Sequence, residues 1–242
     1  MDRAESDSGH RMHLFHCPDL SQLVAELPAE EAHHAVNVLR LSVGDPIGLL
    51  DGNGGFAEAE IEEATKCRCL ARIARKDSVG PERTAHIHIA VAPTKQMERF
   101  EWFLEKATEI GVDRITPVLT HRTERSKLRH DRMEKVLVGA MKQSQRKWLP
   151  QLDDLIKLKD LDSTTTHQKF FGWCDGDHAD LTSAYDPEQD ALIVIGPEGD
   201  FTPEEAEWLI ANGFQAVSLG KSRLRTETAA IAACTWMSFA QR

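Results

Sequence analysis

The sequence predicts an α/β protein in which a smaller β-rich domain precedes a larger domain built on an open sheet. Residues 192–233 contain two consecutive copies of one arrangement, in which a short apolar strand ends in a polar loop that leads into a helix. Such repeats are typical of a sheet with helices packed on its faces. Residues 12–77 differ, because short strand-like segments alternate there with turns. The polar segment 76–84, which contains Gly80-Pro81, is predicted to link the two domains.

The first domain is expected to be a small β-barrel over residues 12–78, preceded by a polar and flexible segment, 1–11. Its one expected helix covers residues 30–41, because the apolar positions there fall on one side: Ala32, Ala35, Val36 and Leu39. Strands are expected at 46–50 and 57–61, joined by a glycine-rich turn, and at 67–73.

The second domain, 85–242, is expected to alternate strands and helices. A strand at 85–92 ends at Pro93, and a helix follows at 97–110 and ends at Gly111. Its inward positions are Phe100, Phe103, Leu104, Ala107 and Ile110. Further strands are expected at 112–119 and 169–174, and residues 176–190 are expected to be mostly loop.

Charge is unevenly distributed along the chain. The net charge is −10, which argues against indiscriminate binding of nucleic acid. Residues 1–63 carry thirteen acidic residues against three arginines, of which Arg40 is the one outside the N-terminal segment. Between Arg114 and Lys147, however, ten basic residues face three acidic ones. This local excess is expected of a phosphate-binding surface; the alternative is a solvated helix surface.

The strongest candidate for a binding site lies in residues 192–233. The apolar run 192–195 is followed by Gly196-Pro197-Glu198-Gly199, and Thr202, Pro203 and Glu205 provide the cap, first-turn proline and capping-box acid of a helix. A second strand, at 214–219, leads through a loop with Lys221, Arg223 and Arg225 into a helix at 227–240. Because ligands of open α/β sheets bind beyond the carboxyl ends of strands, these two loops are expected to form one site. The alternative is a pair of ordinary turns with solvated charges.

Several common sites are excluded by their spacing. Gly220-Lys221-Ser222 resembles the end of a P-loop, but Gln215 stands where that motif needs glycine, and no G-x-G-x-x-G pattern is present. His86 and His88 fall on one side of a strand, although packing explains such a pair better than metal binding does. No zinc-protease or paired C-x-x-C motif occurs, and we predict no metal site.

The composition indicates a cytoplasmic protein. No stretch approaches the roughly 18 apolar residues that span a bilayer, and the first residues lack the apolar core of a secretory signal. The five cysteines are odd in number and show no disulfide-like spacing, so we expect reduced thiols.

Specific motifs resemble the RsmE family of 16S ribosomal RNA uracil-N3 methyltransferases, within the SPOUT superfamily. They are IGPEGDFTPEE, SLGKSRLRTETAA, His34-x5-Arg40 with the turn Asp51-Gly52, Lys106-x-x-Glu109-Ile110-Gly111-Val112, and Gln143-Ser144-x-Arg146-x3-Pro150. The resemblance covers nearly the whole chain. Asp200 departs from it, because the family usually has glycine there, and Lys142, Gln145 and Ser222 also differ from the usual pattern.

The resemblance implies a PUA-like β-barrel that presents RNA, followed by a SPOUT α/β domain with a trefoil knot. It implies a homodimer that buries the helix after Met97 and the C-terminal helix. The implied reaction transfers a methyl group from S-adenosylmethionine to N3 of a uracil in 16S ribosomal RNA, within the small ribosomal subunit.

The expected roles of residues follow from this resemblance and from the positions of the two loops. Arg225 is expected to stabilise the uracil anion, and either Glu227 or Glu198 to accept a proton or orient Arg225. The cofactor is expected to contact Trp173, Ile195, Gly196, Pro197, Glu198, Gly199, Leu219, Gly220, Ser222 and Leu224. The RNA is expected to contact Arg40, Arg122, Arg125, Lys127, Gln143, Arg146 and Arg223. Trp173 and Cys174 fit core packing as well as a place beside an adenine.

Two other functions remain open at this point. The chain could be a related SPOUT enzyme, such as a ribose 2′-O-methyltransferase, although the GPEG and LRTETA motifs favour the N3 enzyme. It could also be a non-catalytic RNA-binding assembly protein. Product mapping distinguishes the first, and cofactor binding without methyl transfer the second.

Overall fold

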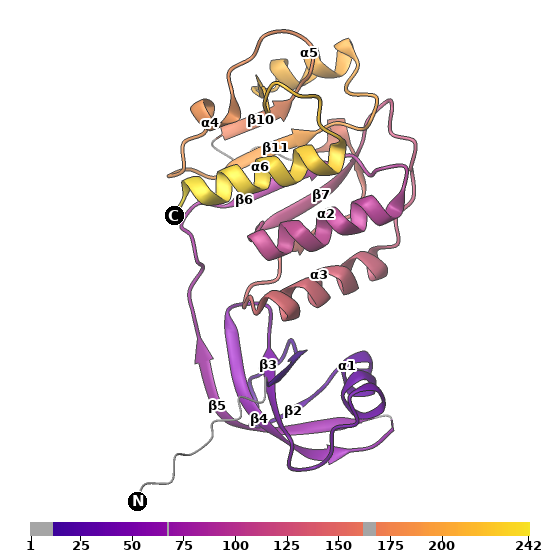
Figure 1. Ribbon diagram of the computed structural model, residues 1–242, viewed down its shortest axis with the longest axis vertical. Coiled ribbons are helices and arrows are strands. Elements are labelled where there is room, and N and C mark those ends of the chain that lie inside the picture. The colour runs from indigo at the N-terminus through magenta and orange to yellow at the C-terminus, as the bar shows by residue number, and fades with distance from the viewer. Residues whose placement is uncertain (1–11, 67, 162–167) are drawn as a thin grey trace, which may run out of the picture. The chain divides into compact units, whose positions relative to one another are not determined.

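A computed structural model describes residues 12–66, 68–161 and 168–242 of the chain (Figure 1). The chain divides into two compact units, Met1–Gly80 and Pro81–Arg242. The predicted flexible segment 1–11 and the predicted start of a strand at Cys67 lie outside the described residues.

The first unit contains a five-stranded sheet in the order β1-β3-β4-β5-β2. Its strands are β1 (His13–His16), β2 (Val24–Glu26), β3 (Pro46–Leu50), β4 (Gly55–Ala64) and β5 (Cys69–Ser78). Strands β1 and β3 are parallel, whereas the other neighbours are antiparallel. In the described part of this unit β1 and β2 lie at the two ends of the strand order, and closure of the sheet into the predicted β-barrel is not found.

Strand β5 continues to Ser78, beyond the predicted end at residue 73 and into the predicted linker. It does so because β4 has ten residues and pairs along its length, with Gly55 opposite Ser78. The predicted strands at 46–50 and 57–61 are confirmed, the second as the centre of β4.

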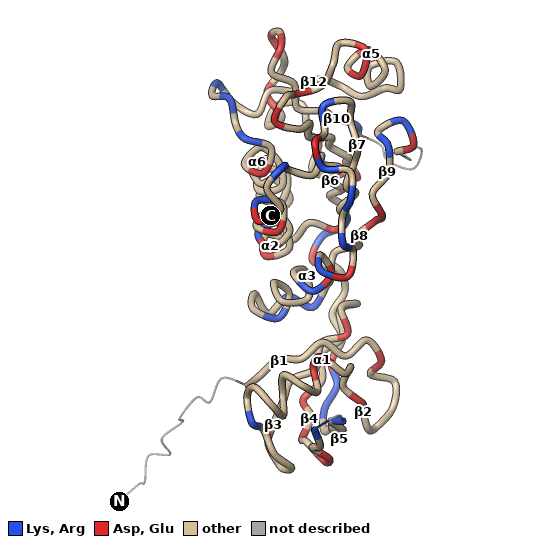
Figure 2. Tube along the Cα trace, turned by 90° about the vertical axis from the view of Figure 1, so that its right-hand side faces the viewer, with Lys and Arg blue, Asp and Glu red and all other residues tan. Residues whose placement is uncertain are grey.

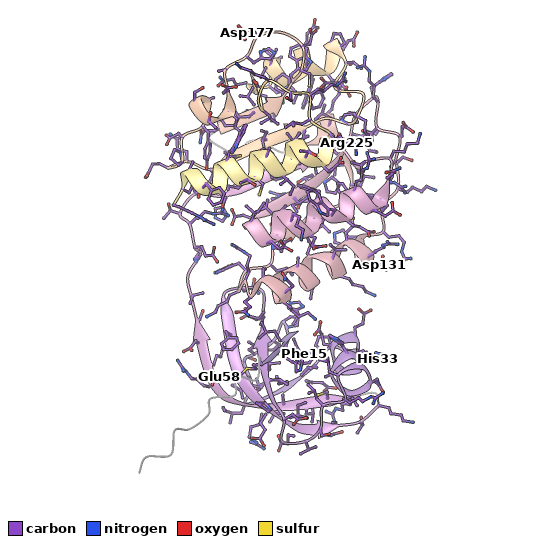
Figure 3. The ribbon with its side chains drawn as sticks, in the orientation of Figure 1. Phe15, His33, Glu58, Asp131, Asp177 and Arg225 are labelled. Carbon is purple, nitrogen blue, oxygen red and sulfur yellow. The ribbon has the colours of Figure 1, made fainter. Side chains whose placement is uncertain are left out.

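The expected helix of this unit is present but changes its winding. It begins as α1 (Ala29–His33), continues as a π-helix over His34–Val38, and leaves Arg40 in a left-handed conformation with φ 58°. Ala32 and Ala35 are buried, as predicted, in the core that contains Phe15 (Figure 3).

The acidic excess of residues 1–63 is partly balanced by the strand that follows them. Buried positions of β4 alternate with glutamates, and β5 places arginines beside these and other acids (Figure 2). Arg68, directly before β5, pairs with Glu26 and Glu63, and Arg72 in β5 pairs with Glu62. The net charge of residues 1–63 therefore overstates how acidic the first unit is beside β4 and β5.

The second unit contains a parallel sheet in the order β12-β10-β11-β6-β7-β8, with β9 also paired to β7. The strands are β6 (Ile87–Val91), β7 (Arg114–Leu119), β8 (Gln151–Leu152), β9 (Ile156–Lys157), β10 (Gln168–Gly172), β11 (Ala191–Ile195) and β12 (Gln215–Val217). The open parallel α/β sheet is thus confirmed. The short strands β8 and β9 were not predicted, because two residues are too few to give a periodic pattern.

Helices cover both faces of this sheet (Figure 1). They are α2 (Met97–Ile110), α3 (His130–Ser144), the short 3-10 helix Leu158–Asp160, α4 (Leu181–Ala184), α5 (Pro203–Ala211) and α6 (Thr226–Ala240). One core packs α2, α3, α4 and α6 against one face, and the other packs α5 and the 3-10 helix against the opposite face. Strands β6 and β11 are buried along their whole length, which explains why β11 is continuously apolar and β6 is apolar except at His88.

Helix α5 begins with the predicted capping box, in which the Thr202 hydroxyl accepts from the Glu205 amide and the Glu205 carboxylate accepts from the Thr202 amide. Helix α6 packs against α2, and its buried residues include Ala230, Ala233 and Met237. Among the residues that the structure describes, none of the helices has both the length and the apolar character that crossing a bilayer requires.

Candidate active site

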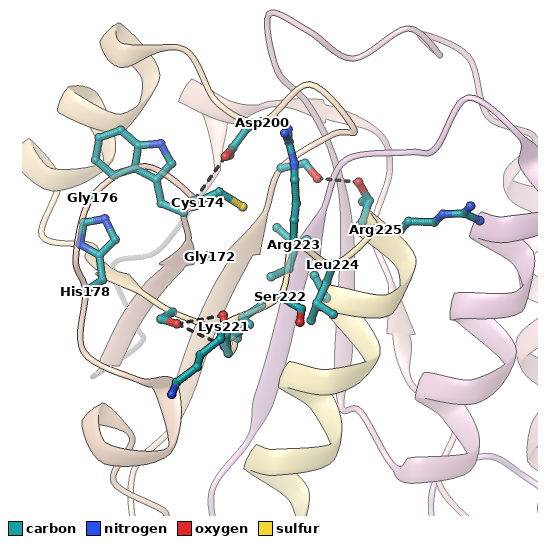
Figure 4. A pocket seen from close by; sticks show the side chains of 18 of the residues that line it. Gly172, Cys174, Gly176, His178, Asp200, Lys221, Ser222, Arg223, Leu224 and Arg225 are labelled. Atoms are coloured by element: carbon teal, nitrogen blue, oxygen red, sulfur yellow. Dashed lines mark hydrogen bonds between the residues drawn. The ribbon is translucent and has the colours of Figure 1, made fainter.

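A pocket of about 820 Å³ lies at the carboxyl ends of β10, β11 and β12, beside the start of α6 (Figure 4). The predicted cofactor residues that line it are Trp173, Ile195, Gly196, Pro197, Glu198, Leu219, Gly220, Ser222 and Leu224. Arg223 and Arg225 line it as well. The sequence thus located most of the wall of a pocket that is formed by residues far apart in the chain.

The two predicted loops follow β11 and β12, which are not neighbours in the sheet although they are consecutive in the chain. Strand β10 lies between β11 and β12 and pairs with both. The chain that leads from β11 through α5 to β12 therefore skips the next place in the sheet, and β10 lies in that place. The loop after β10 therefore forms a third wall.

Trp173 and Cys174 of this wall were considered for a place beside an adenine, but its other residues were not predicted: Gly172, Gly176, Asp177, His178 and Asp180. The available signal was the sequence WCDGDHAD, a polar, glycine-containing loop directly after an apolar strand. Residues 176–190 were expected to be mostly loop, because nothing local indicates that β10 lies between the other two strands.

Apolar groups form the floor of the pocket where β10 ends. A Cβ atom at Gly172 would lie 3.3 Å from Leu219 Cδ1 and 3.4 Å from Ile195 Cδ1. The missing side chain therefore lets Leu219 pack closely over the end of the strand. A larger residue at position 172 would occupy space in the pocket.

Trp173 belongs both to the core and to the pocket, so both interpretations of this residue apply. Its ring packs against the Phe171 ring, with 5.7 Å between the ring centroids. It also stacks on the His178 ring, with 5.5 Å between the centroids and an interplanar angle of 14°. Cys174 is exposed at the pocket wall. Partial burial and the nearby Asp200 carboxylate raise the pKa of its thiol, so the neutral form is favoured and nucleophilic reactivity is reduced.

The loop after β11 is bonded to its neighbours on two sides of the pocket. The Thr226 hydroxyl donates to the Gly196 carbonyl at 3.0 Å, and the backbone amide of Cys174 donates to Asp200 Oδ2 at 3.3 Å. Asp200 adopts φ 63°, which explains why glycine is suited to this position. Its carboxylate also accepts from the Phe201 amide at 2.8 Å, a local bond that helps an aspartate adopt the left-handed conformation.

The two glutamates that the sequence could not distinguish lie in different places. Glu198 lines the pocket and accepts from the Lys95 amide at 3.0 Å. Glu227 is not in the pocket wall but is buried in α6, with 7% of its surface exposed, and its carboxylate lies 3.8 Å from the guanidinium of Arg99. Its Oε2 atom has no hydrogen-bond partner among the described residues.

Three cations on the loop before α6 are exposed: Lys221, Arg223 and Arg225. Within the described part of the chain none of them forms an ion pair, whereas most arginines of this unit do. The side chain of Arg225 extends away from Cys174 and His178 in Figure 4, so a ligand that contacts it would lie at the rim of the pocket. These side chains are available for an anionic partner.

The other predicted RNA-binding residues do not gather at one place. Arg122 donates to the carbonyls of Gly199 and Phe201, and Arg125 to the carbonyl of Lys95. Gly199 itself is not in the pocket wall but packs against Arg122. Lys127 lies beside Arg125 in a shallow surface groove.

Gln143 and Arg146 lie at the end of α3, and Arg40 belongs to the first unit. Arg146 lines a smaller cavity, of about 320 Å³, at the amino ends of β6, β7 and β11, and pairs with Glu82 at 2.9 Å. That cavity is at the amino ends of the strands, whereas the pocket described above is at their carboxyl ends.

His88 supports the packing interpretation of the two strand histidines. Its Nε2 lies 2.7 Å from the Thr116 hydroxyl, which in turn donates to Asp153. Burial and the nearby Arg114 lower the pKa of His88 to about 4, so the ring is neutral at neutral pH. The described residues contain no cluster of three or more histidine, cysteine and acidic side chains that could hold a metal.

Comparisons with known proteins agree across both units. A family model described as an RNA methyltransferase domain matches residues 81–238, and one described as an RNA methyltransferase PUA domain matches residues 27–74. Proteins named ribosomal RNA small subunit methyltransferase E are similar to the chain. The one from Synechocystis is 31% identical and covers 84% of this chain and 69% of its own length. The one from Bacillus subtilis is 28% identical and covers 88% of this chain and 89% of its own length.

Solved structures give the same result. A probable rRNA-methyltransferase from Porphyromonas gingivalis is 40% identical, with a TM-score of 0.86 over 95% of this chain and 98% of that one. The ribosomal RNA small subunit methyltransferase E from Neisseria gonorrhoeae, bound to S-adenosyl methionine, is 30% identical, with a TM-score of 0.81 over the same shares.

Proposed function

The chain belongs to the RNA methyltransferase family that includes ribosomal RNA small subunit methyltransferase E, and from this premise we propose that it transfers a methyl group from S-adenosylmethionine to N3 of a uracil in 16S ribosomal RNA. The observation that carries the proposal is the pocket at the ends of β10, β11 and β12. A similar protein is bound to S-adenosyl methionine. We place the enzyme in the cytoplasm and its substrate within the small ribosomal subunit.

The pocket residues fit such a cofactor in size and in chemistry. About 820 Å³ is within the usual range for small-molecule sites. Ile195, Leu219 and Leu224 offer apolar contacts for an adenine, and Trp173 offers a ring edge. The backbone groups of 195–198 and 219–224 offer hydrogen bonds to the polar atoms of the cofactor.

The cofactor supplies a methyl group that is already activated on a sulfonium. The protein's main task is therefore to hold the uracil with N3 in line with that methyl group. N3 must lose its proton, and a guanidinium beside O2 or O4 stabilises the anion that forms. We assign this role to Arg225 and phosphate binding to Arg223, because both are exposed at the pocket and form no ion pair within the described residues.

Glu198 is the better candidate for accepting the proton, because it lines the pocket whereas Glu227 is buried in α6. Glu227 keeps the second role considered for it, that of orienting Arg225, from which it is two residues away in the chain; the cation that it pairs with is Arg99. Lys127, which lies beside Arg125 in a separate surface groove, stays a candidate RNA contact away from the pocket.

We also propose the finer features of the family's fold, a PUA-like β-barrel in the first unit and a knotted C-terminal domain. A homodimer through α2 and α6 is supported by large apolar residues exposed on those helices, Trp102 at 43% and Phe239 at 54%.

Methyl transfer tests the proposal directly. Small subunits that lack the modification, and naked 16S ribosomal RNA, are incubated with the protein and methyl-labelled cofactor, and the nucleosides are analysed. Label in 3-methyluridine is expected. Label in a 2′-O-methylated nucleoside would support the related SPOUT activity, and cofactor binding without transfer to either RNA would support an assembly protein.

Arg225→Ala separates catalysis from cofactor binding. We expect transfer to be abolished while the dissociation constant of the cofactor changes little, because the guanidinium lies at the rim of the pocket. Normal turnover by this variant would refute the role given to Arg225.

A further inference from the structure

The loop after β11 is hydrogen-bonded to the segments that follow β10, β6 and β7 and to the start of α6. Its contacts with Thr226 of α6 and with Cys174 after β10 are described above. On its other side, the Lys95 amide, after β6, donates to Glu198. The remaining contact comes from residues 120–125, after β7, through Arg122. This last segment does not line the pocket.

Arg122 makes the most extensive of these contacts. Its Nη1 donates to the Gly199 carbonyl at 2.6 Å and to the Phe201 carbonyl at 3.2 Å. Its aliphatic part packs on Gly199, where an added Cβ would lie 3.1 Å from Arg122 Cδ. One side chain thus fixes the backbone on both sides of Asp200, the residue with positive φ.

A second bond holds the segment that carries Arg122. The His121 amide donates to Glu205 Oε1 at 2.6 Å, while Oε2 of the same carboxylate accepts from the Thr202 amide at 2.9 Å. The capping box of α5 therefore extends to the loop after β7. This arrangement leaves the guanidinium aimed at backbone carbonyls of its own chain.

We propose that Arg122 is a positioning residue for the cofactor: it holds the turn Gly199–Phe201 in the shape that completes the pocket, and its guanidinium is not an RNA contact. The proposal rests on the proposed function for the identity of the ligand. It replaces the RNA-binding role that the basic segment 114–147 indicated for this residue. Arg223, which is exposed at the pocket and forms no ion pair within the described residues, keeps its predicted contact with the RNA.

The test compares Arg122→Met with Arg129→Met. Methionine keeps the aliphatic packing on Gly199 but removes the donor. Arg129 is a matched control from the same basic segment, because it is exposed and pairs with its near neighbour Asp131 at 2.8 Å. Arg122→Lys restores a charge and one donor, so a merely electrostatic role predicts full rescue and a positioning role predicts partial rescue.

Three quantities are measured for each protein: hydrogen exchange of the amides at 200–202 without ligand, the affinity for S-adenosylmethionine without RNA, and the affinity for 16S ribosomal RNA without cofactor. For Arg122→Met we expect exchange about ten-fold faster and cofactor affinity about ten-fold weaker, the scale of one charge-assisted hydrogen bond. RNA affinity should be the same as that of Arg129→Met, and Arg129→Met should match the wild type in the first two quantities.

The proposal is overturned if Arg122→Met keeps wild-type exchange and cofactor affinity, or if its main defect is weaker RNA binding. Exchange needs no ligand, so its outcome stands apart from the proposed function. If wild-type protein binds the cofactor without methylating RNA, the proposed function fails, while a loss of affinity in Arg122→Met still supports positioning. If the wild type binds no cofactor, faster exchange in Arg122→Met supports the hold on the turn, and unchanged exchange overturns it.

Discussion

Replacing Thr226 by valine tests whether the start of α6 determines the shape of the pocket. Thr226 is 4% exposed, and its hydroxyl donates to the carbonyl of Gly196, which is also buried. Valine has nearly the same shape, so the substitution removes this donor and creates no large cavity. A buried carbonyl that loses its donor costs about 1–3 kcal/mol. In a unit of this size we expect the melting temperature to fall by about 2–4 °C for each kcal/mol.

Part of that cost is expected to appear in cofactor binding, because Gly196 lies in the pocket wall. A loss of about 1.4 kcal/mol weakens binding ten-fold. Thermal unfolding without ligand and calorimetric titration with S-adenosylmethionine measure the two effects. Thr226→Ser keeps the hydroxyl and is expected to bind nearly as well as the wild type. Equal affinity and equal melting temperature for the valine variant would show that this bond does not hold the loop.

Two further predictions concern stability. The folded pKa of His88, about 4, is below the value of 6.5 for a free histidine, so the unfolded chain binds more protons between these pH values. This difference stabilises the second unit by about 3 kcal/mol above pH 6.5, and the contribution is lost as the pH falls toward 4. Denaturant unfolding measured across this pH range should show that the unfolding free energy of His88→Gln lacks this dependence on pH. The same pH dependence in His88→Gln and in the wild type would contradict the assignment. Gly220 has φ 112° with open space around it, so Gly220→Ala should cost about 1 kcal/mol through backbone strain alone; an unchanged unfolding midpoint would contradict this.

Local features of the site could be predicted because each is encoded within a few residues. The capping box of Thr202 and Glu205, the strand before Gly196 and the cationic loop before α6 are all local. The same holds for helix α2, whose end at Gly111 requires a left-handed residue with φ 106°.

The rest depends on pairing between distant segments. Nothing near Gln168 indicates that β10 would lie between β11 and β12 and add a third wall to the pocket. Likewise, a count of charges between Arg114 and Lys147 does not show that Arg122 and Arg125 donate to backbone carbonyls. The composition of a segment gives the sign of its net charge, whereas the fold decides which of its cationic side chains have partners within the protein.

The central claim is that the carboxyl ends of three strands hold the methyl donor. Hydrogen exchange with and without saturating S-adenosylmethionine tests it most directly. The account predicts slower exchange in three segments, 172–180, 195–202 and 218–226, and no change around Arg146 at the opposite edge of the sheet. Protection at that opposite edge, or none in the three segments at saturation, would contradict it.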